Sequence, residues 1–272
     1  MKRTAFFISD STGITAEVMG ESLLSHFPGI EFDKQVLPYV DSEAKANEAV
    51  ATINLAAERD GNRPIIFETL ISKNLRRIIT SANGFSFDVI NTFLKPLEQE
   101  LGAHSTSDVG RPRVASKDTN YIRRIEAINF ALDNDDGARL NRYPQADIIL
   151  TGVSRSGKTP TSLYLALQFG IYPANYPITE EDMEVFDLPK PLREYRGKLF
   201  GLTISAERLT AIRKERRANS RYASVDQCRR EVAEVERLFE QYDIPYIDTT
   251  DVSIEEISTR ILATTGIERH FR

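Results

Sequence analysis

The chain has 272 residues, of which 41% are hydrophobic and 28% are charged, as in ordinary folded globular proteins. This composition argues against collagen-like, coiled-coil and disordered chains, and the length suits one large or two medium domains. Because 35 Lys and Arg residues are opposed by 40 Asp and Glu residues, the net charge is −5, and a general basic field for binding nucleic acid is excluded.

A single cysteine, Cys228, excludes an intramolecular disulfide and a four-thiolate zinc site within one chain. The three histidines, His26, His104 and His270, show no metal-binding spacing. The longest apolar runs span a few residues, far short of the roughly 20 that a membrane helix needs, and the N-terminus lacks the apolar core of a secretory signal. We therefore expect a cytoplasmic protein without a nucleic-acid or membrane partner.

Short apolar runs alternate with capped amphipathic segments along the chain, the pattern of βα units on a mostly parallel sheet. Residues 1–102 are predicted to form an N-terminal α/β region. Its predicted strands are 5–8, 36–40 and 64–67, and its predicted helices are 15–27, 42–57, 74–82 and 87–101. Residues 103–120 lack periodicity and are rich in turn formers, so they are predicted to connect two domains.

Residues 121–272 are predicted to form a second α/β domain. Its predicted helices include 121–132 and 160–169, and its predicted strands or extended segments are 146–150, 173–177, 198–204 and 245–248. Three further helices are predicted to begin after the hydroxyl residues Ser205, Ser224 and Ser253, which can accept hydrogen bonds from the first free amides of a helix.

One loop of the second domain matches the phosphate-binding pattern G-x-x-x-x-G-K-[ST] at every fixed position. It consists of Gly152, Val153, Ser154, Arg155, Ser156, Gly157, Lys158 and Thr159. It joins a predicted strand to a predicted helix, so its amides can surround a polyphosphate while Lys158 binds terminal oxygens and Thr159 binds Mg2+. This context favours a P-loop, and hence a nucleotide-binding, kinase-like domain at 121–272, over a simple glycine-bearing turn.

Two aspartates are candidates for the acidic partner or catalytic base of this loop. Asp248 ends a predicted strand, as a Walker-B aspartate does, and its alternative interpretation is a turn residue. Asp10 lies in the polar loop 9–15 after the first strand, which could bind phosphate or simply cap the next helix. The basic stretch 214–230 indicates either a docking surface for a phosphorylated partner or a solvated helix face.

Several blocks of the sequence resemble the phosphoenolpyruvate synthase regulatory proteins. They are 8–17, 135–137, 152–165, 174–177, 200–217 and 219–223, in the same order as in that family. The resemblance covers nearly the whole chain and is weakest at 104–120. The segment 156–166 is more similar to this family than to the sister group that regulates pyruvate, phosphate dikinase.

This resemblance implies a bifunctional enzyme that uses ADP to phosphorylate a threonine of the synthase, in its phosphohistidine form, and so inactivates it. It also implies removal of that phosphate by inorganic phosphate, with release of pyrophosphate. Lys158 is then expected to serve both directions, with Asp10 or Asp248 as the base. The alternatives are the same chemistry on the dikinase, a small-molecule P-loop kinase, or a nucleotide-dependent switch without catalysis. The sequence leaves open whether the protein is a monomer or a homodimer.

Overall fold

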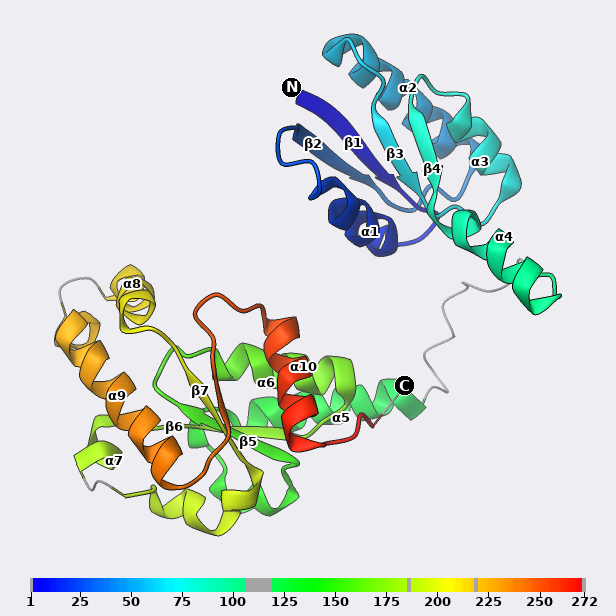
Figure 1. Cartoon of the computed structure of the whole chain (residues 1–272). Helices are drawn as coiled ribbons and strands as arrows, with labels where there is room; N and C mark the ends of the chain where they lie inside the picture. The colour runs from blue at the N-terminus through cyan, green and yellow to red at the C-terminus, as the bar shows by residue number, and fades with distance from the viewer. Residues whose placement is uncertain (1, 106–118, 185–186, 218–219, 271–272) are drawn as a thin grey trace. The chain divides into compact units, whose positions relative to one another are not determined.

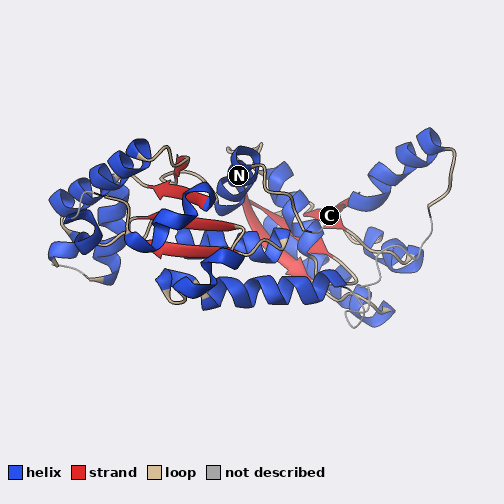
Figure 2. Ribbon diagram, turned by 90° about the horizontal axis from the view of Figure 1, so that it is seen from below, coloured by secondary structure: helices blue, strands red, loops and turns tan. Residues whose placement is uncertain are grey.

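The computed structural model describes residues 2–105, 119–184, 187–217 and 220–270. The chain divides into two compact units, Met1–Pro112 and Arg113–Arg272, which are considered separately (Figure 1). Most of the connector predicted at 103–120 lies outside the described residues. Each unit holds one parallel four-stranded sheet with helices on both faces (Figure 2), which confirms the predicted α/β class.

The N-terminal unit has the strand order β2-β1-β3-β4. Its elements are β1 (Lys2–Ile8), α1 (Ile14–Leu24), β2 (Glu31–Leu37), α2 (Glu43–Asp60), β3 (Ile65–Glu68), α3 (Lys73–Thr80), β4 (Phe85–Asp88) and α4 (Val89–Leu101). The central strand β1 is buried on both faces because Phe6 and Ile8 pack with α2 and α3, whereas Ala5 and Phe7 pack with α1. Two layers of helices therefore cover this sheet.

Two strands of this unit differ from the sequence prediction. β2 lies at Glu31–Leu37 rather than 36–40, because the chain leaves the sheet at Pro38 and Tyr39 takes a left-handed conformation with a φ of 56°. Residues Phe85–Asp88 form the edge strand β4, although the prediction began a helix at residue 87. Four residues carry too little periodicity to be separated from the helical pattern that follows.

The C-terminal unit has the strand order β6-β5-β7-β8, the same order as the first unit, although the sequence shows no internal repeat. Its strands are β5 (Ile148–Gly152), β6 (Pro173–Pro177), β7 (Leu199–Thr203) and β8 (Tyr246–Asp248). Its α-helices are α5 (Thr119–Asp133), α6 (Lys158–Phe169), α7 (Glu180–Glu184), α8 (Ala206–Arg216), α9 (Val225–Gln241) and α10 (Ile254–Thr265). In both units the loop after the first strand lies where the strand order reverses, the usual ligand-binding position of such sheets.

Local signals in the sequence placed most elements of this unit correctly. Ser205, Ser224 and Ser253 each accept a hydrogen bond from the amide three residues later and begin α8, α9 and α10. Short 3-10 helices add η2 (Asp135–Gly137), η3 (Leu140–Gln145), η4 (Lys190–Lys198) and η5 (Arg221–Ala223). Within the described part of the chain, no helix combines the length and apolar character needed to cross a bilayer.

Candidate functional site

The predicted phosphate-binding loop connects the buried strand β5 to α6. Gly152 has a φ of 145°, and a Cβ atom at this position would lie 2.2 Å from the carbonyl oxygen of Leu202 in β7, so no larger residue fits. Gly157 adopts a left-handed conformation with a φ of 90° directly before α6 and offers no side-chain cap to that helix. A helix that begins in this way suits an anion as the partner of its first amides.

Lys158 is folded back onto this loop. Its side chain is buried, and its ammonium group donates to the carbonyl oxygens of Val153, at 2.8 Å, and of Gly152, at 3.2 Å. Burial lowers the pKa of Lys158 to about 8, whereas the negative charges of Asp136 and Asp135 act in the opposite direction. A phosphate group in the loop would supply further negative charge to the same ammonium group.

The other residues of the predicted loop occupy different environments. Arg155 is exposed and has a φ of 78°. The hydroxyl of Ser156 is buried and has no hydrogen-bond partner among the described residues. A buried hydroxyl without a partner is costly, so the position favours a ligand or water that would bond to it.

Two aspartates that the sequence prediction did not place in the site, Asp135 and Asp136 in η2, lie beside the loop. The hydroxyl of Thr159 donates to Oδ1 of Asp135 at 2.8 Å, and the side-chain amide of Asn175 donates to the same oxygen. Asp136 is exposed and has a φ of 48°, a strained conformation for a non-glycine residue. The sequence signal for them was the block 135–137 in the family resemblance. By composition alone, this block indicates an acidic turn.

The pair formed by Thr159 and Asp135 suits Mg2+. A P-loop hydroxyl and a nearby aspartate are the groups that hold this ion in P-loop enzymes. Among the described residues, no three His, Cys, Asp or Glu side chains form a metal cluster. Two protein ligands would be enough for Mg2+, because phosphate oxygens and water usually complete its coordination.

The two sequence candidates for the base, Asp248 and Asp10, both form local hydrogen bonds. The carboxylate of Asp248 closes a turn by accepting the amide hydrogen of Thr250 at 2.8 Å and its hydroxyl hydrogen. The adjacent Thr249 contacts the predicted phosphate-binding loop, donating to the carbonyl oxygen of Ser156 at 3.2 Å. Asp10 belongs to the N-terminal unit, where its carboxylate accepts the amide hydrogen of Ile71 at 2.9 Å.

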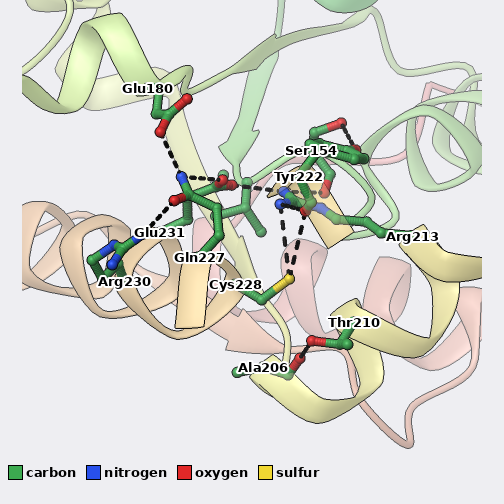
Figure 3. A network of polar contacts seen from close by, with 12 residues as sticks. Ser154, Glu180, Ala206, Thr210, Arg213, Tyr222, Gln227, Cys228, Arg230 and Glu231 are labelled. Atoms are coloured by element: carbon green, nitrogen blue, oxygen red, sulfur yellow. Dashed lines mark hydrogen bonds and ion pairs between the residues drawn. The ribbon is translucent and has the colours of Figure 1, made fainter. Parts of the chain in front are cut away.

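A buried polar network supports the predicted phosphate-binding loop from α8, η5 and α9 (Figure 3). The guanidinium of Arg213 donates to the carbonyl oxygen of Ser154 at 3.2 Å and to the carboxylate of Glu231 at 2.7 Å, and it stacks on the ring of Tyr222. The hydroxyl of Tyr222 in turn donates to the hydroxyl of Ser154 at 3.1 Å. These contacts hold Ser154, the third residue of the loop, through both its backbone and its side chain.

Two arginines of the basic stretch 214–230 form exposed ion pairs, Arg221 with Glu180 and Arg229 with Glu207. This pairing agrees with a solvated helix face for those two side chains. Arg213 itself is wholly buried, although an arginine near the end of an amphipathic helix is usually exposed, so sequence patterning gave no sign of its role.

The N-terminal unit contains a cavity of about 970 Å³ at the carboxyl ends of β1 and β3. The loop 9–15 lines one side, and the residue before α1 is Gly13, which supplies no side-chain cap. The cavity is lined by both basic and acidic side chains, including Arg76, Asp88 and the buried Glu68. Burial, reinforced by the charges of Asp88 and Asp10, raises the pKa of Glu68 to about 7.

Replacing Glu68 with glutamine is expected to stabilise this unit at high pH. Because the folded pKa of Glu68 is raised from 4.5 to about 7, protonated Glu68 favours folding, and this contribution is lost as the pH rises through 7. Glu68→Gln should therefore raise the unfolding free energy by roughly 1–3 kcal/mol at pH 8 and by much less at pH 5. Urea unfolding at both pH values measures this, with the exposed Glu48→Gln as the matched control. Equal effects at both pH values would contradict the assignment.

The chain is similar to known proteins over nearly its whole length. A family model described as kinase/pyrophosphorylase matches residues 5–262. Proteins from Pseudomonas fluorescens, Pseudomonas putida and Pseudomonas aeruginosa are each 58% identical over 272 residues, covering 100% of this chain and 99–100% of their own length. All three carry the name of a phosphoenolpyruvate synthase regulatory protein. The chain therefore belongs to the kinase/pyrophosphorylase family, as its sequence blocks predicted, and is a phosphotransferase.

Proposed function

We propose that this protein is a bifunctional regulator of phosphoenolpyruvate synthase. It transfers the β-phosphoryl group of ADP to a threonine of the synthase and removes that group by phosphorolysis. The observation that carries the proposal is the buried Lys158 of the P-loop, with Thr159, Asp135 and Asp136 beside it, in a chain of the kinase/pyrophosphorylase family. The names of the full-length relatives support the synthase as the target.

The P-loop accounts for the binding of both phosphate substrates. Residues 152–159 would hold the diphosphate of ADP in one direction and inorganic phosphate in the other, with Lys158 neutralising charge on the transferred group. Thr159 and Asp135 would hold Mg2+, which when bound offsets negative charge on the phosphates. Because phosphoryl transfer depends chiefly on positioning and charge, one set of residues can serve both directions.

The two reactions are related by one proton transfer. In the forward direction the threonine oxygen attacks the β-phosphorus, the bond from that phosphorus to the bridging oxygen breaks, and AMP leaves. In the return direction an oxygen of inorganic phosphate attacks the phosphothreonine phosphorus, and pyrophosphate and threonine are released. We propose Asp136 as the group that moves the proton. Its carboxylate would accept the proton of the threonine hydroxyl in the first reaction and return it to the threonine oxygen in the second.

Incubation with β-labelled ADP and phosphohistidine-loaded synthase tests the function. Label on a synthase threonine, chased into pyrophosphate by added phosphate, is the expected result. Label on a small metabolite would identify a small-molecule P-loop kinase, and ADP binding without transfer would identify a switch. Transfer to pyruvate, phosphate dikinase in place of the synthase would identify the sister activity.

Gel filtration and light scattering of the purified protein alone decide between the monomer and the homodimer.

Replacing Asp136 with asparagine is expected to slow both reactions. Loss of a general base typically costs about 10²–10⁴-fold in kcat, whereas ADP affinity, which depends on the loop, should change little. Single-turnover transfer and calorimetry with ADP measure the two effects. Asp243→Asn is the matched control because Asp243 is also exposed with a positive φ, of 52°, but follows α9. Unchanged kcat in Asp136→Asn would assign the proton to another group.

A further inference from the structure

Asn175 occupies an unexpected position for a polar residue. It lies at the centre of the edge strand β6, opposite Leu150 of β5, and is completely buried. Asparagine is disfavoured within strands, and burying its amide costs free energy unless hydrogen bonds replace those to water. Its presence at this point calls for specific partners.

Those partners all belong to one segment, residues 134–143. The side-chain oxygen of Asn175 accepts the backbone N–H of Asp136 at 2.9 Å, and its side-chain nitrogen donates to Oδ1 of Asp135. Its backbone N–H donates to the carbonyl oxygen of Asn134 at 3.1 Å, and its backbone carbonyl accepts from the hydroxyl of Tyr143 at 3.1 Å. One strand residue thus binds segment 134–143 at four points.

These contacts determine where the two carboxylates lie. The left-handed conformation of Asp136 costs about 1–2 kcal/mol, so it needs a structural restraint, and the bond from its N–H to Asn175 supplies one. At Asp135, both donors, Asn175 and Thr159, bond to the same oxygen. A carboxylate oriented in this way keeps acceptor capacity on its other oxygen for a cation or water.

We propose that Asn175 is a positioning residue for phosphoryl transfer. Its side-chain amide holds the Asp135 carboxylate near Thr159 and fixes the main chain of Asp136. Asn175 therefore acts on the reaction through Asp135 and Asp136. This inference rests on the proposed function, because it needs a transfer reaction at the P-loop. It assigns no direct contact between Asn175 and a substrate.

The test uses the full-length chain with Asn175→Ala and Asn175→Asp. The aspartate variant keeps the size of the side chain and the acceptor for Asp136, but it replaces the donor to Asp135 with a second carboxylate oxygen, which repels that carboxylate. For both variants we expect kcat to fall and the half-saturating Mg2+ concentration to rise, each by about 10–100-fold, the usual effect of losing a residue that orients a ligand. The KM for ADP should change less than about threefold, because the loop that binds it is intact.

A double-mutant cycle separates positioning from general destabilisation. In the Asn175→Ala background, Asp135→Asn should cost much less in kcat than it does in the wild type, because Asn175 acts through that carboxylate. Asn54→Asp is the matched control, since Asn54 also uses its side-chain oxygen to accept a backbone N–H, from Asn83 in the N-terminal unit. It should leave kcat and the Mg2+ dependence unchanged.

The outcomes are distinct. If the wild type transfers phosphate and both Asn175 variants have its kcat and its Mg2+ dependence, Asn175 has no positioning role. Parallel loss of ADP binding, kcat and thermal stability, with additive effects of Asp135→Asn, also overturns it by assigning Asn175 to folding alone. Absence of transfer in the wild type contradicts the proposed function itself. If Asn175→Ala does not fold, the Mg2+ dependence and cycle measured with Asn175→Asp decide the question.

Discussion

Lys158→Met is expected to abolish measurable transfer in both directions. The ammonium group of Lys158 is buried in the P-loop, 2.8 Å from the carbonyl oxygen of Val153, and is the cation available to neutralise the transferred phosphoryl group. Removing a preorganised cation from such a site typically slows phosphoryl transfer by about 10³–10⁵-fold. The measurements are the rate of label transfer from ADP and the rate of pyrophosphate release from phosphorylated synthase.

The same lysine is expected to make ADP binding dependent on pH. Its pKa is lowered from 10.5 to about 8, so the ammonium group loses its proton as the pH rises through 8. ADP affinity should fall about tenfold per pH unit above pH 8, with proton uptake on binding. Calorimetry in buffers of different ionisation enthalpy measures both, and Lys158→Met should show neither effect.

Lys34→Met provides the control for this experiment. Lys34 forms an exposed ion pair with Glu21 in the N-terminal unit, so its loss should leave both reactions and the pH dependence as in the wild type. If Lys158→Met kept near-normal rates while Lys34→Met behaved as expected, the P-loop would not be the transfer site. The proposed function would then fail.

Arg213→Met is expected to produce the largest loss of stability in the C-terminal unit. The guanidinium of Arg213 is wholly buried, and its removal leaves Glu231 buried without its cation and the carbonyl oxygen of Ser154 without its donor. Breaking a buried ion pair by removing one partner costs about 3–5 kcal/mol. Urea unfolding followed by a probe in this unit, such as the fluorescence of its tyrosines, measures the change.

Two further variants separate the ion pair from the support of the loop. The double variant Arg213→Met with Glu231→Leu should regain most of the lost stability, because it leaves no uncompensated charge. It should still bind ADP more weakly than the wild type, since Ser154 lacks its donor from α8. Arg229→Met, which breaks the exposed pair with Glu207, should cost no more than about 1 kcal/mol. A small effect of Arg213→Met, similar to that of Arg229→Met, would contradict the role of the network.

The sequence by itself determined the features that depend on a few neighbouring residues. The loop between β5 and α6 and the serine caps of α8, α9 and α10 were predictable because glycine conformations and cap hydrogen bonds act within one turn of the chain. The α/β class followed from the alternation of apolar runs and amphipathic segments. The family followed from long blocks in conserved order, which the kinase/pyrophosphorylase match bears out.

Only the tertiary structure decided which side chains meet at the loop. Asp135 lies 24 residues before Thr159 and 40 before Asn175, and Arg213 lies 59 after Ser154, so no spacing in the sequence indicates these contacts. They arise because the parallel strand order brings η2 against the edge strand β6, and because α8 and α9 pack beneath the loop. Two chemically identical side chains therefore have different roles. Arg213 is buried and bonded to the loop, whereas Arg229 is exposed at the surface.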